Sequence, residues 1–202
     1  MDRHWGYLMR YCSLEEREAV LQNLIKSQGG ASVFVWNSVM LGQKCASDRE
    51  KVLERMKKAG VQPNDMTCSA LIQGYSSGAE KEMALERMVA AGVQPNATTW
   101  TTVMGGYASF VDRARVFQRM TAAPHAVAVT RESIRSLFGS VEIFVDASHH
   151  LQSALDVARG LPDDLLCNHQ ILGKLLPMCA EANDPQLLRR LWGIGAAGLV
   201  NP

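Results

Sequence analysis

Apolar residues in the middle of the chain recur three or four positions apart, in stretches that polar turns separate. One stretch holds Trp36, Val39 and Met40, and the next falls at residues 52–56. Spacings of three and four residues place side chains on one face of an α-helix. The pattern therefore predicts two amphipathic helices within residues 34–60, each with one apolar face to bury.

The same pattern returns after 32 residues, and then again. The string GVQPN occupies residues 60–64 and recurs at residues 92–96. Like residues also line up in columns at this spacing: Trp36/Cys68/Trp100, Gly42/Gly74/Gly106 and Met56/Met88/Met120. One helix pair cannot bury its own apolar face, so successive pairs must stack. We expect the tryptophan and methionine columns to be buried.

Turn residues mark where each helix pair ends and the next begins. Gly60 and Gly92 are expected to adopt the left-handed conformation that ends a helix, and a proline three residues later prevents its continuation. Asn64 and Asn96 follow at once, and each is expected to cap the next helix. The fold class predicted is all-α: a right-handed α-solenoid of stacked antiparallel helix pairs, with first helices inside.

The repeat divides the chain into three segments. Residues 33–124 hold three clear repeats. Residues 1–32 are predicted to form a degenerate first repeat, whose second helix begins with a capping box at residues 13–16. Residues 125–202 are predicted to form degenerate C-terminal repeats. Their expected helices span residues 130–145, 148–160, 164–179 and 185–194, with a further inter-repeat turn at residues 198–202.

Composition limits the classes of function. Hydrophobic residues make up 47% of the chain, enough for a core, and no apolar run is long enough to span a membrane. The 21 basic and 20 acidic residues leave a net charge of +1, which excludes a protein that binds nucleic acid by charge alone. The five scattered cysteines contain no CxxC motif and indicate reduced thiols. Acidic residues within the first thirty positions argue against an intact organellar targeting peptide.

The sequence contains no catalytic motif. It has no glycine-rich phosphate loop, no GxSxG elbow and no HExxH zinc motif. His149 and His150 are adjacent, so their rings point in different directions and make a poor metal pair. We therefore predict no catalytic residue, no metal site, no cofactor and no small-molecule substrate, and the protein is not expected to be an enzyme.

The repeats resemble the pentatricopeptide repeat (PPR). The first clear unit shows this in VWNSVMLG at residues 35–42 and ERMKKAGVQPN at residues 54–64. The second matches in TCSALIQGY at residues 67–75 and ERMVAAGVQPN at residues 86–96, and the third in TWTTVMGGY at residues 99–107 and VFQRM at residues 116–120. These units depart from the usual repeat in one respect: they lack about one helical turn at the junction of their two helices.

The resemblance implies a role and a set of site residues. PPR proteins bind single-stranded RNA in mitochondria or chloroplasts, and each repeat reads one base with two or three side chains. Carried over, the reading residues are Asn37 with Asn64, Ser69 with Asn96, and Thr101. By family analogy the first pair favours a pyrimidine and the second favours adenine. Asn64 and Asn96 are equally explained as ordinary helix caps.

Charge points to a second reading. The first-helix segments at residues 65–77 and 97–110 contain no lysine or arginine, so they offer little to a phosphate backbone. Basic residues gather on the second helices, where a charged face is most often solvated. Arg113, Arg115 and Arg119 form a predicted docking surface for protein or RNA.

Two functions remain open at this stage. The short array and its near-neutral charge favour a scaffold subunit of a large organellar assembly, such as a mitoribosome or a respiratory or photosynthetic complex. Its partners would be protein subunits and single-stranded or ribosomal RNA, and a mitochondrion is favoured over a chloroplast. The alternative is a free, sequence-selective single-stranded RNA-binding PPR protein in organellar RNA processing or translation.

Overall fold

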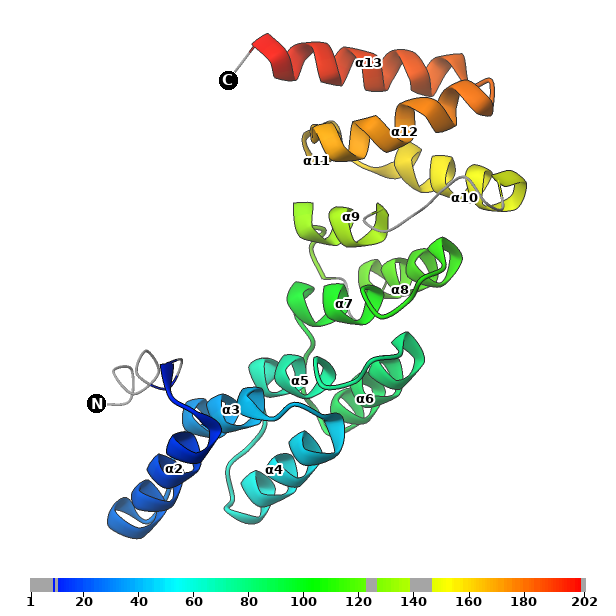
Figure 1. Ribbon diagram of the computed structural model, residues 1–202. Helices are drawn as coiled ribbons and strands as arrows, with labels where there is room; N and C mark the ends of the chain where they lie inside the picture. Colours follow the sequence, from blue (N-terminus) through cyan, green and yellow to red (C-terminus); the bar gives the residue numbers. More distant parts are fainter. Residues whose placement is uncertain (1–8, 10, 123–126, 139–146, 201–202) are drawn as a thin grey trace. The chain divides into compact units, whose positions relative to one another are not determined.

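The predicted helices are present throughout the computed structural model, which describes residue 9 and residues 11–122, 127–138 and 147–200 (Figure 1). All twelve secondary-structure elements in these ranges are α-helices. In chain order they are α2 (Leu14–Gln28), α3 (Val33–Gly42), α4 (Ala46–Lys58), α5 (Asp65–Ile72), α6 (Gly78–Ala90), α7 (Ala97–Met104), α8 (Phe110–Thr121), α9 (Arg131–Phe138), α10 (Ala147–Gly160), α11 (Asp163–Leu166), α12 (His169–Glu181) and α13 (Pro185–Val200). The predicted all-α fold of stacked helix pairs is confirmed.

The chain divides into two compact units, residues 1–106 and 107–202. In the first unit, α3 packs on α5 and α5 packs on α7, so the first helices of successive repeats form one layer (Figure 1). The second helix α4 contacts both α3 and α5, and α6 contacts both α5 and α7. Each second helix therefore bridges two consecutive first helices, and this covers the apolar face that a single pair would leave exposed.

The residue columns found in the sequence form the core. Trp36, Cys68 and Trp100 are 2%, 1% and 0% exposed, and the methionine column is equally buried. Burial raises the pKa of the Cys68 thiol to about 12, so this thiol stays neutral and packs as a small apolar group. The expected burial of both columns is confirmed, and the two tryptophans pack within the core.

Caps and turns also follow the predictions. The hydroxyl of Ser13 accepts the Glu16 N–H, and the Glu16 carboxylate accepts the Ser13 N–H, which completes the capping box of α2. Asn64 and Asn96 are the N-caps of α5 and α7. After α4 and α6 the chain turns at two glycines with positive φ, Gly60 at 74° and Gly92 at 86°.

Replacing Gly92 with alanine is expected to lower the free energy of unfolding by about 1 kcal/mol, because a Cβ atom disfavours positive φ. No atom lies within 4 Å of the added Cβ, so the cost comes from the backbone alone. Gly30 is the matched control, since its Cβ position is equally open and its φ is not positive. Thermal melts of Gly92→Ala and Gly30→Ala check this, and equal melting temperatures would show that the turn carries no strain.

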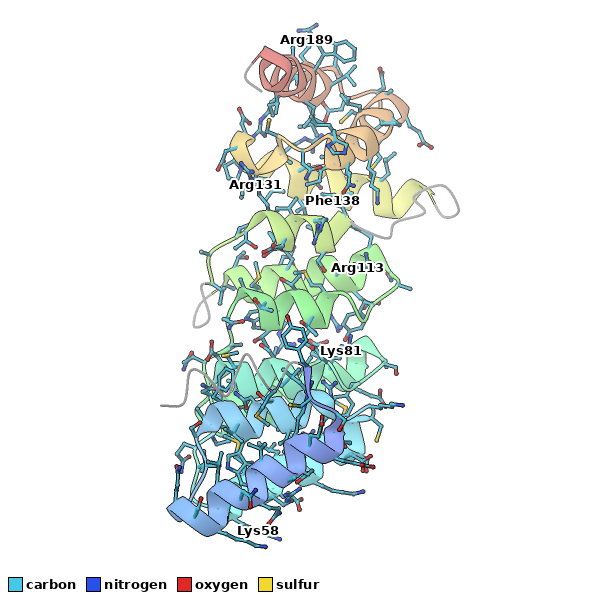
Figure 2. All side chains as sticks on the ribbon, turned by 60° about the vertical axis from the view of Figure 1, so that its left-hand side comes forward. Lys58, Lys81, Arg113, Arg131, Phe138 and Arg189 are labelled. Atoms are coloured by element: carbon cyan, nitrogen blue, oxygen red, sulfur yellow. The ribbon has the colours of Figure 1, made fainter. Side chains whose placement is uncertain are left out.

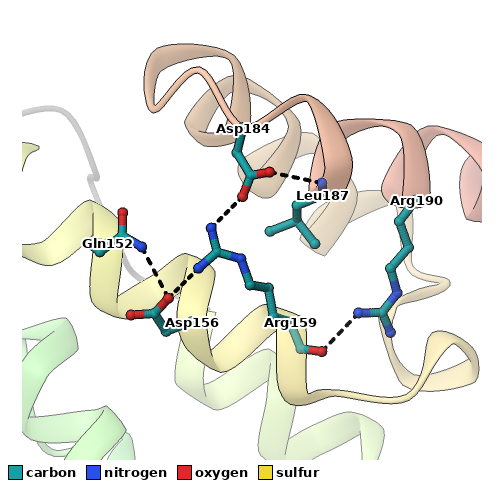
Figure 3. A network of polar contacts seen from close by, with 6 residues as sticks. All are labelled: Gln152, Asp156, Arg159, Asp184, Leu187 and Arg190. Atoms are coloured by element: carbon teal, nitrogen blue, oxygen red, sulfur yellow. Dashed lines mark hydrogen bonds and ion pairs between the residues drawn. The ribbon is translucent and has the colours of Figure 1, made fainter.

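In the second unit, α8 packs on α9 and α10, and α12 contacts α9, α10 and α13. A polar network ties α10 to the start of α13 (Figure 3). Arg159 of α10 pairs with Asp156 and, at 2.5 Å, with Asp184. Asp184 also accepts the Leu187 N–H at 3.0 Å, and these two bonds hold the pKa of its carboxyl below the usual value. Arg190 donates to the Arg159 carbonyl at 3.0 Å, which closes the network.

Several expectations for the C-terminal segment are corrected. The helix expected over residues 164–179 is two helices, because the Asn168 side chain accepts the Gln170 N–H and starts α12 afresh. The inter-repeat turn expected at residues 198–202 is wrong for residues 198–200, which continue α13. A single glycine did not end this helix, since the apolar residues after it extend the helical pattern. Residues 139–146, the end of the helix expected from residue 130, lie outside the described residues.

The compact units do not coincide with the three predicted segments. Their boundary falls between Gly106 and Tyr107, inside the third clear repeat, whose two helices are α7 and α8. The divisions at residues 32/33 and 124/125 concern sequence register, and they stay predictions, as does the right-handed turn of the superhelix.

Candidate functional site

The predicted reading residues lie on the layer of first helices. Asn37 belongs to α3, Ser69 to α5 and Thr101 to α7, each separated from the next by one repeat. Asn64 and Asn96 stand at the N-termini of α5 and α7. The layer therefore brings each reading residue close to the cap that follows it in the next repeat.

The first predicted pair forms a hydrogen-bonded cluster with Thr67. The Asn37 amide nitrogen lies 3.4 Å from the Asn64 side-chain oxygen, and the Thr67 hydroxyl donates to the Asn37 oxygen at 2.8 Å. Asn64 oxygen also accepts the Thr67 N–H at 3.0 Å, and Thr67 Oγ1 accepts the Asn64 N–H at 3.1 Å. A cap, a reading residue and a buried hydroxyl thus share one network.

The second predicted pair is joined in the same way by Thr99. The Ser69 and Thr99 hydroxyl oxygens are 2.7 Å apart, and the Thr99 hydroxyl donates to the Asn96 side-chain oxygen at 3.1 Å. The Asn96 amide nitrogen donates to Asp65 at 2.8 Å. Thr101 differs, because its hydroxyl donates to the Ala97 carbonyl of its own helix at 2.5 Å.

These clusters differ in how much surface they present. Asn37 and Ser69 are 3% and 8% exposed, whereas Asn64, Asn96 and Thr101 are half-buried. Large apolar side chains stand beside them: Phe34 is 37% exposed and Met66 is 51% exposed. Each precedes a reading residue by three positions and so lies on the same helix face. Sequence reasoning missed this pair, although the spacing of 32 between residues 34 and 66 was visible.

The predicted docking surface is corrected at Arg113. This side chain is 4% exposed and donates to the backbone carbonyls of Tyr107 at 2.6 Å and Ser136 at 3.3 Å. Burial lowers the pKa of its guanidinium. Arg115 is exposed, lies 5.7 Å above the Tyr107 ring and pairs with Asp112 at 3.7 Å, and Arg119 is half-buried. The three arginines therefore do not form one exposed basic patch.

Arg113 belongs to a column of cations that sequence reasoning did not identify. The column is Arg17, Arg49, Lys81 and Arg113, each 32 residues from the next, and Figure 2 labels the last two. Arg17 donates to the Cys12 carbonyl at 3.1 Å and to the Ser38 carbonyl at 2.8 Å. Arg49 donates to the Gln43 carbonyl at 3.0 Å and to the Ala70 carbonyl. We call Arg17, Arg49 and Arg113 the joint arginines, since each links the turn of its own repeat to the first helix of the next.

The glycine column meets the same joints. A Cβ on Gly74 would lie 2.7 Å from Arg49 Cδ and 3.0 Å from Ala46 Cα. A Cβ on Gly106 would lie 2.8 Å from Gly78 Cα, and the Gly106 carbonyl accepts the Gly78 N–H at 2.9 Å. Glycine is therefore required where the end of a first helix approaches the preceding second helix.

Other basic residues of the second helices form internal ion pairs. Arg55 contacts both oxygens of Glu18, at 2.8 and 3.0 Å, and its guanidinium lies 5.6 Å from the centre of the Trp36 ring. Arg87 pairs with Glu50 at 2.5 Å. Each pair joins residues 37 positions apart, so these cations link second helices of successive repeats. This accounts for part of the basic character that the sequence placed on these helices.

The described residues offer little to other classes of function. They contain no group of three or more His, Cys, Asp or Glu side chains that could hold a metal ion, and the side chains of His149 and His150 lie outside them. A cavity of about 660 Å³ between α8 and α10 is lined mainly by apolar side chains together with Arg115 and Asp156. Within the part of the chain that the structure covers, none of the helices combines the length and apolar character needed to cross a bilayer.

Comparison with known proteins identifies the class of repeat. Residues 38–79 match the family described as the pentatricopeptide repeat domain. The structure is similar to that of the pentatricopeptide repeat protein PPR10 from maize, with a TM-score of 0.58 and 19% sequence identity. The match covers 86% of this chain and 26% of that protein, so this chain spans about a quarter of its length. No curated protein matches the sequence significantly.

These matches confirm the resemblance that the sequence indicated. The chain contains a pentatricopeptide repeat and has the fold of a helical pentatricopeptide-repeat protein. Proteins built from this repeat generally bind organellar RNA and are typically non-catalytic.

Proposed function

We propose that the chain binds single-stranded RNA through the face formed by α3, α5 and α7, and that it does so in an organelle without catalysing a reaction. One observation carries this proposal. The cluster of Asn37, Asn64 and Thr67 is repeated 32 residues later by Ser69, Asn96 and Thr99. A polar group in the same place on successive repeats is the arrangement that reading one base per repeat requires.

The surroundings of these clusters suit a nucleobase. Exposed Phe34 and Met66 supply apolar surface against which the flat face of a base can stack, while the neighbouring amides and hydroxyl can bond its edge. Asn64 is more exposed than Asn37, so a base would meet Asn64 first and reach Asn37 through a small outward movement of that side chain. The proposed preference is for a pyrimidine at the first cluster and adenine at the second.

Charge sets the expected strength of binding. Neither α5 nor α7 contains a lysine or arginine, and Arg55 and Arg87 are paired with glutamates. Few phosphates would be neutralised, so the dependence of affinity on salt concentration should be shallow. Binding by this face would depend more on contacts with the bases than on charge.

The scaffold interpretation is the weaker of the two that the sequence left open. What the chain matches is the repeat itself, and this supports the RNA-binding alternative better than membership of a mitoribosome or of a respiratory or photosynthetic complex. A role in organellar RNA processing or translation follows from this proposal, with a mitochondrion favoured over a chloroplast.

The test is binding of the 202-residue chain to a pool of short single-stranded RNAs of random sequence, followed by sequencing of the bound fraction. Asn37→Ala combined with Ser69→Ala is expected to weaken binding to the selected RNA about tenfold or more, because two base contacts are lost. Asn23→Ala on α2 is the matched control, since Asn23 is exposed and lies outside the proposed face.

The scaffold interpretation predicts a different result. The isolated chain would then bind RNA weakly, without base preference, and the double variant would behave like the control. Selection of no sequence from the pool by a folded chain would contradict the proposed function.

A further inference from the structure

Two buried threonines stand behind the proposed reading residues. Thr67 and Thr99 are both 0% exposed, so neither side chain can touch RNA. Each belongs to the first turn of a first helix and contacts the reading residue of the preceding repeat: Thr67 contacts Asn37, and Thr99 contacts Ser69. Since a threonine hydroxyl carries one proton, the direction in which it donates fixes the hydrogen-bonding character of its neighbour.

In the first cluster the proton of Thr67 orients the Asn37 amide. Thr67 Oγ1 accepts the Asn64 N–H, and its own proton points to Asn37 Oδ1, the nearer acceptor at 2.8 Å. The Asn64 oxygen already accepts the Thr67 N–H and faces the Asn37 amide nitrogen. Both amide oxygens are therefore occupied. The groups that remain for a ligand are amide N–H donors.

In the second cluster the polarity is reversed. Thr99 donates its proton to the Asn96 side-chain oxygen at 3.1 Å, so Ser69 must be the donor in the 2.7 Å contact with Thr99. The Ser69 proton is then used inside the protein, and its oxygen keeps only acceptor lone pairs for a ligand. Two repeats with the same threonine thus present opposite hydrogen-bonding character.

We propose that Thr67 and Thr99 are positioning residues that set the base preference of the preceding repeat. The inference rests on the proposed function. Donors at Asn37 and Asn64 match a pyrimidine, whose edge carries O2 together with N3 of cytosine or O4 of uracil. The acceptor at Ser69 matches the exocyclic amino group of adenine. The preference of one repeat is therefore determined partly by a residue of the next repeat that never contacts the base.

The test uses Thr67→Val in the full chain, which removes the hydroxyl and keeps the shape of the side chain. Without the hydroxyl, the Asn37 amide can turn and present its oxygen. In selection from the random RNA pool, pyrimidine preference at the first nucleotide is expected to fall about fivefold, while adenine preference at the next stays unchanged. Thr99→Val should have the reciprocal effect, and Thr67→Ser, which keeps the hydroxyl, should restore the pyrimidine preference.

The outcomes separate this inference from the function on which it rests. A wild-type chain without base preference at either nucleotide would contradict the proposed function. A wild-type chain that selects bases, with a folded Thr67→Val variant that selects them equally well, would overturn the positioning role. An equal loss of affinity for all RNAs would overturn it too, because it would indicate a structural effect alone. Should melts show Thr67→Val to be unfolded, the result for Thr99→Val decides.

Discussion

Replacing Gly106 with alanine is expected to lower the free energy of unfolding of the N-terminal unit by about 2 kcal/mol, because the added methyl group has no room. Its Cβ would lie 2.8 Å from Gly78 Cα, 2.9 Å from Gly78 N and 2.9 Å from Lys81 Cδ. Two of these are backbone atoms at the start of α6, and the bond from Gly78 N–H to the Gly106 carbonyl holds them in place. The lysine stem can move aside, but the backbone cannot do so without losing this bond.

The neighbouring residue provides the control. Gly105 has φ of −63°, and a Cβ there would meet nothing closer than the Thr101 carbonyl of its own helix at 3.4 Å. Gly105→Ala should therefore be neutral or slightly stabilising, by up to about 0.5 kcal/mol, because alanine restricts the unfolded chain. Urea unfolding followed by the fluorescence of Trp36 and Trp100 compares the two variants. Equal midpoints would show that the joint tolerates a side chain.

Arg49→Met is expected to cost about 2–3 kcal/mol, because it leaves the carbonyls of Gln43 and Ala70 without their buried donor. Methionine keeps most of the apolar stem, so the loss reports mainly on the guanidinium. Burial lowers the pKa of Arg49, which shows that the charged form is partly desolvated and depends on these carbonyls for compensation. Arg49→Lys should recover little of the stability, since an ammonium group cannot reproduce the planar fork that serves both carbonyls.

Lys51→Met on the same helix is the control. Lys51 is exposed and pairs with Asp48 at 2.8 Å, a surface ion pair of the kind that contributes little. Its removal should leave the urea midpoint almost unchanged. If Arg49→Met unfolds at the same urea concentration as Lys51→Met, Arg49 is not a structural link between repeats.

The parts of the fold that sequence predicted well are those with local causes. Helix caps at Ser13, Asn64 and Asn96, and the turns at Gly60 and Gly92, depend on residues a few positions apart. Periodicity located the core columns for the same reason. The C-terminal segment was predicted less well because its register is irregular, and no local signal distinguished the break at Asn168 from the continuing helix at residues 198–200.

The candidate site was predicted in composition but not in environment. The resemblance selected Asn37, Asn64, Ser69 and Asn96, and the structure brings them into two clusters. The threonines that organise these clusters come from the following repeat, so their role depends on stacking that sequence alone does not display. Arg113 was misassigned for a related reason: its charge suggested a surface position, whereas its carbonyl partners lie 6 and 23 residues away and hold it in the interior.

The joints have a direction and a fixed pitch. The arginine always comes from the earlier repeat and the glycine from the later one, and the Glu18–Arg55 and Glu50–Arg87 pairs advance along the chain in the same sense. Every repeat thus carries a plug at one end and a socket at the other. A duplicated block of residues 65–96, inserted after residue 96, would find both mating parts already in place. The chain could in this way be lengthened one nucleotide-sized module at a time, whereas an insertion of any other length would separate each plug from its socket.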